Sequence, residues 1–71
     1  MGYRNRTYID DMVDLFGYDY VIGYCLCSEH NLRNLAETES NQDKRDNMIR
    51  KANRFAADMN RLSKERFDYG L

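Results

Sequence analysis

A chain of 71 residues is long enough for one small domain, so we expect a single helical domain over residues 1–71. Apolar residues make up 42% and charged residues 32%, a balance typical of a globular protein and unlike that of a disordered one. The formal net charge of −1 argues against a strongly basic nucleic-acid-binding surface. A domain this short buries only about 60% of its unfolded surface, so a second subunit would help to stabilise it.

The sequence carries no expected membrane or export segment. Its longest apolar run, residues 20–27, is interrupted by Gly23 and is far too short to cross a bilayer. Residues 1–14 are polar and acidic, unlike a secretory signal. Cys25 and Cys27 are two residues apart on an expected helix, which is a poor geometry for a disulfide. We therefore expect a cytoplasmic protein that makes no contact with a membrane.

The first expected helix covers residues 8–16. Thr7 is a favourable N-cap, and Asp10 three residues later completes a capping-box pair. Gly17 is expected to end the helix, because glycine tolerates the left-handed conformation used at helix C-termini. One apolar face runs along this segment and contains Tyr8, Ile9, Met12, Val13 and Phe16.

The second expected helix begins at residue 20, after a short connection over residues 18–20 in which Asp19 is a candidate cap. Gly23 costs about 1 kcal/mol relative to alanine inside a helix, so we interpret it as a site where another backbone comes close. Residues 18–27 are also rich in Tyr, Val and Ile, which leaves a β-strand as the alternative. The sequence offers no second strand to pair with it.

The third expected helix covers residues 42–66, with Ser40 and Asp43 as its cap pair. At 1.5 Å per residue it is about 36 Å long. Its apolar residues recur at helical spacing and form one stripe, which contains Met48, Ala52, Phe55, Met59 and Leu62.

These segments predict an all-α fold of three helices. The second and third helices form an antiparallel hairpin, and the short N-terminal helix packs across it. The long third helix and the thin core leave apolar surface uncovered, so we expect a homodimer. The predicted core contains Ile9, Val13, Phe16, Val21, Cys25, Leu32, Leu35, Met48, Ile49, Ala52, Phe55, Met59 and Leu62.

Neither a metal site nor a catalytic set is expected. Cys25, Cys27 and His30 are the only cysteines and histidine. Zinc takes four protein ligands in a structural site and three plus a water in a catalytic one. Cys27 and His30 can share a helix face, but Cys25 does not join them. A Cys27–His30 nucleophile pair would lack a pocket and an oxyanion hole. We therefore expect no enzyme activity, no catalytic residue, no metal and no cofactor.

The charge is unevenly distributed along the chain. Residues 1–40 carry three arginines against seven acids, whereas residues 41–71 carry eight basic residues against five acids. Such asymmetry can let the two halves of the chain, or two copies of it, attract each other. Five of the six tyrosines also lie in the first 24 residues, and tyrosine is enriched at interfaces. The expected partner-binding surface is this acidic, tyrosine-rich front, formed by Tyr3, Tyr8, Asp10, Asp11, Asp14, Tyr18 and Asp19.

Two alternatives remain for the charged surfaces. The acidic front can be an ordinary solvated face, and the basic side chains of the third helix can be an ordinary outer face. A phosphate could instead bind to Arg33, Arg50 and Arg54, which would indicate a nucleotide-binding accessory protein or a DNA- or RNA-binding module. No glycine-rich phosphate loop accompanies these arginines.

Four stretches of the chain resemble a small bacteriophage family of unknown function, some of whose members are described as nucleotide-kinase-like. They are YVIGYCLC at residues 20–27, NLRNL at 31–35, IRKA at 49–52 and MNRL at 59–62. The resemblance implies a helical hairpin and a phage or prophage origin. Combined with the missing catalytic set, it suggests a small phage protein that binds a host protein. An inhibitor of a host defence or nucleic-acid enzyme, similar in role to an anti-CRISPR protein, would fit.

Overall fold

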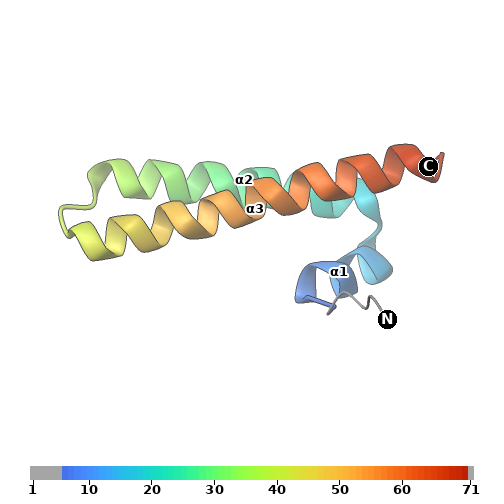
Figure 1. Ribbon diagram of the computed structural model, residues 1–71, viewed down its shortest axis with the longest axis horizontal. Helices are drawn as coiled ribbons and strands as arrows, with labels where there is room; N and C mark the ends of the chain where they lie inside the picture. The colour runs from blue at the N-terminus through green and yellow to red at the C-terminus, as the bar shows by residue number, and fades with distance from the viewer. Residues whose placement is uncertain (1–5, 71) are drawn as a thin grey trace, which may run out of the picture.

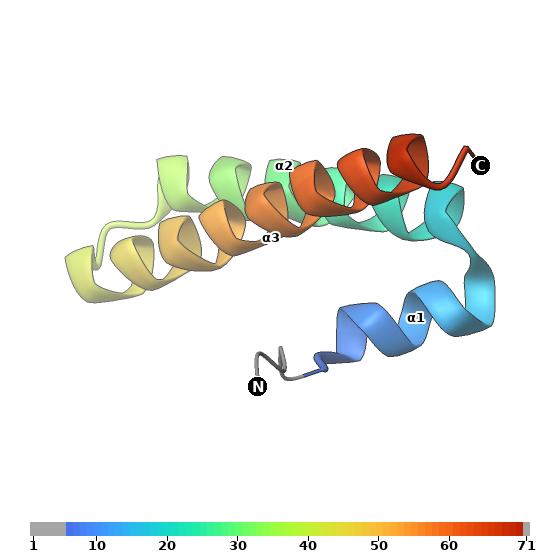
Figure 2. The ribbon, with the colours of Figure 1, turned by 45° about the vertical axis from the view of Figure 1, so that its right-hand side comes forward.

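The computed structural model describes residues 6–70, which form three α-helices and no strand. They are α1 (Tyr8–Phe16), α2 (Tyr18–Thr38) and α3 (Gln42–Asp68). α2 and α3 lie side by side as an antiparallel hairpin, and α1 folds back against the end of the hairpin where α2 begins (Figures 1 and 2). The predicted three-helix fold is confirmed, and the alternative strand over residues 18–27 is wrong. Tyr3 lies outside the described residues.

A sharp elbow at Gly17 separates α1 from α2. The Gly17 N–H donates to the Val13 carbonyl at 2.8 Å and closes α1, and its φ of +87° is one that favours glycine. Gly17 is also the N-cap of α2, which starts at the next residue. The predicted connection over residues 18–20 is therefore wrong, and Asp19 lies in the first turn of α2 instead of capping it.

The cap of α3 also differs from the prediction by one residue. The side-chain oxygen of Asn41 accepts a hydrogen bond from the Lys44 backbone N–H at 3.1 Å, so Asn41, and not Ser40, is the N-cap. α3 then extends to Asp68, two residues beyond the predicted end. The capping pair predicted for α1 is confirmed, because the Asp10 carboxylate accepts from the Thr7 backbone N–H at 3.0 Å.

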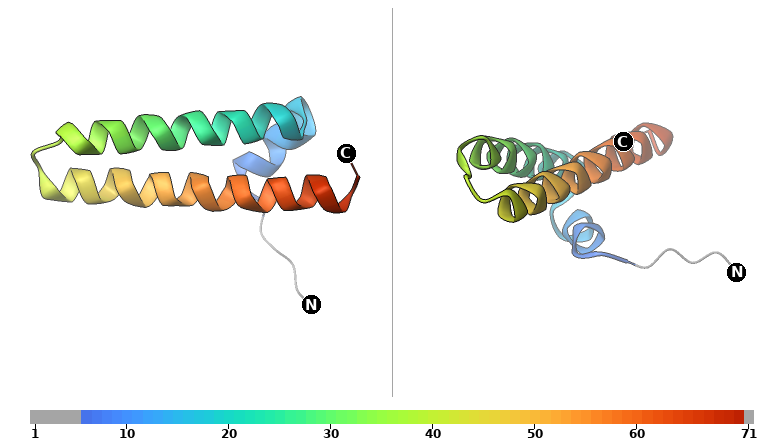
Figure 3. Two further views of the ribbon diagram at one scale, coloured as in Figure 1. Left: turned by 90° about the horizontal axis from the view of Figure 1, so that it is seen from above. Right: turned by 60° about the vertical axis from the view of Figure 1, so that its left-hand side comes forward.

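The main core lies at the elbow end of the hairpin. Ile9, Val21, Cys25 and Leu62 form one buried cluster there, contributed by all three helices. Nearer the loop at residues 39–41, the buried apolar residues are two alanines, Ala36 of α2 and Ala52 of α3. The loop half of the hairpin is thus only two helices thick, as the view from above shows (Figure 3).

Three residues of the predicted core are exposed. Phe16 is 56%, Leu35 55% and Ile49 38% exposed. Phe16 is itself the last residue of α1 at the elbow, and Ile49 lines a second hollow on α2 and α3. Leu35 lies on the loop half of the hairpin, which the short α1 does not reach. The close backbone approach expected at Gly23 is also wrong. Gly23 is exposed, and a Cβ added there would meet no heavy atom within 4 Å.

Candidate functional site

Aromatic side chains are exposed on both sides of the elbow. Phe16 ends α1 and Tyr20 lies in the first turn of α2, and their ring centroids are 4.9 Å apart. More than half of each side chain remains open to solvent. Asp19 lies between them in sequence, and its side chain is 82% exposed. We call Phe16, Asp19 and Tyr20 the elbow surface.

The end of α3 lies beside the elbow surface (Figures 1 and 3). Arg66 pairs with Asp19 through its Nε at 2.8 Å, and the Tyr18 hydroxyl donates to a Glu65 carboxylate oxygen at 3.3 Å. Burial, followed by the negative charge of Glu65, raises the pKa of Tyr18. These contacts hold the predicted residues Tyr18 and Asp19 against α3. Four further residues of the acidic front lie on α1: Tyr8, Asp10, Asp11 and Asp14.

Asp11 and Asp14 project from α1 and are well exposed. Both carboxylates pair with Arg6, whose Nη2 lies 3.1 Å from Asp11 Oδ1. The hydrogen bond that Arg6 donates to Asp11 and the charge of Asp14 raise the pKa of Arg6. Because two carboxylates share one guanidinium, this part of α1 keeps a net negative charge.

Asp10 differs from the other acids of the predicted front because it is buried, with 7% of the residue exposed. Its Oδ1 lies 3.1 Å from Nη2 of Arg61, and the other oxygen caps α1 at Thr7. Arg61 also pairs with Glu65 at 2.7 Å. Burial disfavours the Arg61 charge, but Glu65 and Asp10 outweigh that effect and raise its pKa. Asp10 therefore fastens α1 to α3 and is not presented to a partner.

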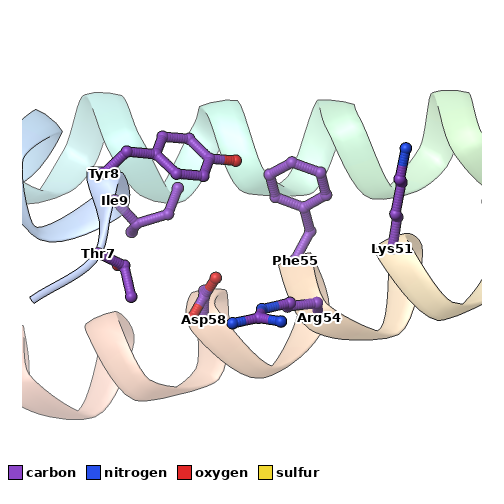
Figure 4. A pocket seen from close by; sticks show the side chains of 7 residues that line it. All are labelled: Thr7, Tyr8, Ile9, Lys51, Arg54, Phe55 and Asp58. Carbon is purple, nitrogen blue, oxygen red and sulfur yellow. The ribbon is translucent and has the colours of Figure 1, made fainter. Parts of the chain in front are cut away.

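A hollow of about 390 Å³ opens where the start of α1 meets α3 (Figure 4). It is lined by Thr7, Tyr8, Ile9, Lys51, Arg54, Phe55 and Asp58. Tyr8 is 57% exposed at its edge, and the ring of Tyr24 packs edge-on against Phe55 at 5.9 Å. Within residues 6–70, neither Lys51 nor Arg54 forms an ion pair. The hollow therefore combines an apolar wall with the carboxylate of Asp58 and with two cations that form no ion pair within residues 6–70.

The three arginines of the phosphate alternative are not gathered around one hollow. Arg54 lines the hollow beside α1, whereas Arg33 lines a second one on α2 and α3, and Arg50 lines neither. Arg33 is also held by its neighbours, because it donates to Glu29 at 2.9 Å and to Asn53 at 3.1 Å. This arrangement offers no shared phosphate position for the three guanidinium groups.

The two cysteines have different surroundings. Cys25 is buried in the main core, and burial, followed by the charge of Asp58, raises the pKa of its thiol. Cys27 is exposed.

Among residues 6–70, no three His, Cys, Asp or Glu side chains are grouped so that they could hold a metal ion. In the same part of the chain, no helix has the length and apolar content needed to span a bilayer.

Sequence reasoning overlooked Phe16 and Tyr20 as surface residues. Helical periodicity placed Phe16 on the apolar face of α1, and it could not show that the elbow turns this residue away from the hairpin. Apolar residues on both sides of a helix-ending glycine were the available signal.

No protein-family model, curated protein or solved structure matches the chain.

Proposed function

We propose that this chain is a small non-enzymatic protein of phage type that binds a host protein through the elbow surface. The supporting observation is the exposed Phe16–Tyr20 ring pair beside the exposed carboxylate of Asp19. A few anchor residues supply most of the binding free energy at many interfaces, and tyrosine is enriched among them. An exposed ring pair that does not contribute to the core of such a small domain is well suited to that role.

The partner we propose has a basic surface. Asp19 on α2 adds negative charge beside the exposed rings, and its side chain stays 82% exposed although Arg66 pairs with it. Negative charge speeds association with a basic surface and disfavours acidic partners. Host enzymes that act on nucleic acids have such surfaces. We therefore propose inhibition of a host defence or nucleic-acid enzyme in the host cytoplasm, and we propose that the inhibitor is a homodimer.

The test is capture from a lysate of the host bacterium, followed by quantitative mass spectrometry. The baits are the unaltered chain, the double variant Phe16→Ser/Tyr20→Ser, and the control Leu26→Ser/Ile49→Ser. The control also replaces two exposed apolar residues, 41% and 38% exposed, on the hairpin away from the elbow. Circular dichroism confirms that each bait is folded.

We expect the unaltered chain and the control to retain the same host protein. The Phe16→Ser/Tyr20→Ser bait should lose it by about 30-fold or more, since truncating an interface anchor costs about 2 kcal/mol or more. Raised salt should weaken capture, because exposed charges are screened. Equal recovery of the host protein on the folded Phe16→Ser/Tyr20→Ser bait and on the folded control would contradict the proposed surface.

A further inference from the structure

α1 is much shorter than the hairpin against which it packs. At 1.5 Å per residue, the nine residues of α1 span about 14 Å and the 27 residues of α3 about 40 Å. α1 lies against the elbow half of the hairpin only (Figures 2 and 3). The face that α1 begins to cover thus continues, uncovered, toward the loop.

This uncovered part has a definite chemistry, and we call it the open face: Tyr24, Leu35, Lys51, Arg54 and Phe55. The last three line the hollow beside α1, and Tyr24 packs on Phe55. Leu35 follows Tyr24 by eleven residues, about three helical turns, so both lie on one side of α2. Tyr24 is 38% and Leu35 55% exposed. The open face is therefore apolar and positive on balance, because its two cations exceed the one carboxylate, Asp58, that lines the same hollow.

The outer face of α1 has the complementary chemistry. Leu15 on the outer side of α1 is 75% exposed, and Tyr8, at the edge of the hollow, is 57% exposed. Asp11 and Asp14 lie beside them, and among residues 6–70 both carboxylates pair with the single cation Arg6. This surface is apolar and negative, whereas the open face is apolar and positive.

We propose that the open face is occupied by a second copy of this chain. The two hairpins lie antiparallel and face to face around a two-fold axis, with the outer face of each α1 on the open face of the other copy. Every contact is then made twice, as a two-fold interface requires. Two α1 helices together span about 27 Å, which fits within the length of the hairpin. The inference rests on the proposed homodimer and supplies its interface.

Two charge-reversed variants test this geometry: Lys51→Glu/Arg54→Glu on the open face, and Asp11→Lys/Asp14→Lys on α1. Light scattering coupled to size exclusion should give a dimer of about 17 kDa for the unaltered chain, twice the 8.5 kDa of one copy. Each variant alone should dimerise about 100-fold more weakly than the unaltered chain and elute as a monomer. An equimolar mixture of the two should form a heterodimer, because both contacts then join opposite charges.

The matched control is Arg50→Glu/Lys64→Glu, which reverses two exposed cations that line neither hollow. It should remain a dimer. A monomeric unaltered chain at micromolar concentration would overturn both the homodimer and this interface. A dimer that survives both reversals, or a mixture that stays monomeric, would overturn the interface alone and leave the homodimer and the host contact standing.

A second measurement covers the case in which a charge-reversed chain fails to fold. In a Cys27→Ser background, chains carrying Leu15→Cys and chains carrying Leu35→Cys are mixed under mild oxidation. The antiparallel arrangement brings the elbow of one copy near the loop end of the other, so a disulfide should join the two kinds of chain. Absence of that mixed disulfide would count against the interface.

Discussion

Asp10 of α1 and Arg61 of α3 are separated by 51 positions in the sequence and by 3.1 Å in space. Their side chains are 8% and 25% exposed, so the pair is largely shielded from water. Asp10 also caps α1. Arg61 also pairs with Glu65, whose carboxylate accepts a hydrogen bond from the Tyr18 hydroxyl. One small polar network thus fixes the short helix, the elbow and the end of α3 relative to one another.

Replacing Asp10 with alanine should destabilise the fold much more than replacing its neighbour Asp11. The Asp10→Ala change removes a cap and leaves the Arg61 charge poorly hydrated, which we expect to cost about 2 kcal/mol or more. For a domain of this size that lowers the Tm by roughly 10 °C. Thermal unfolding followed by circular dichroism measures both variants. Equal losses for Asp10→Ala and Asp11→Ala would show that the buried pair has no special role.

Two glycines should respond in opposite directions to the same substitution. Gly17 has a φ of +87°, so Gly17→Ala strains the elbow and should cost about 1–2 kcal/mol. Gly23 lies inside α2 with no heavy atom within 4 Å of an added Cβ. Gly23→Ala should therefore stabilise the chain by up to about 1 kcal/mol. Urea unfolding of the two variants at equal concentration provides the comparison. A loss of stability in Gly23→Ala would contradict the open surroundings of Gly23.

The sequence was sufficient where the signals are local. Thr7, Asp10 and Gly17 lie within ten positions and define both ends of α1, and the apolar stripe of α3 identified its face correctly at Ala52 and Leu62. A single glycine that ends one helix and caps the next was not foreseen, because an expected turn usually takes several residues. The Ser40 prediction failed because two adjacent residues, Ser40 and Asn41, can both act as caps.

Longer-range features could not be foreseen in the same way. Periodicity shows which side of a helix is apolar, but not whether another element reaches it, which is why Leu35 and Ile49 proved exposed. The burial of Asp10 depends on Arg61, and nothing in the local sequence links them. The acidic front was therefore a mixture of one structural carboxylate and several surface ones.

The exposed cysteine should react and the buried one should not. Cys27 is open to solvent, whereas Cys25 lies in the main core with a raised pKa, so little thiolate forms there. Iodoacetamide at neutral pH should modify one site on the folded chain, and peptide mass spectrometry should locate it at Cys27. Both sites should react in urea. Labelling of Cys25 at the rate of Cys27 in the folded chain would mean that the core opens readily.

Stability should fall as the pH rises above the ordinary thiol pKa of about 8.5. Burial raises the pKa of Cys25, and burial together with Glu65 raises that of Tyr18, so both groups keep their protons longer in the folded chain than in the unfolded one. Their stabilising contribution is complete below the unfolded pKa values and is lost as the pH rises through the folded ones. Urea midpoints measured from pH 7.5 to about 10.5 should therefore decrease.

Cys25→Ala should lower stability throughout but flatten the first part of this decrease, and Tyr18→Phe should flatten the later part. Cys27→Ala serves as the control with an unchanged slope, and a Cys25→Ala curve parallel to that of the unaltered chain would rule out the thiol as the cause.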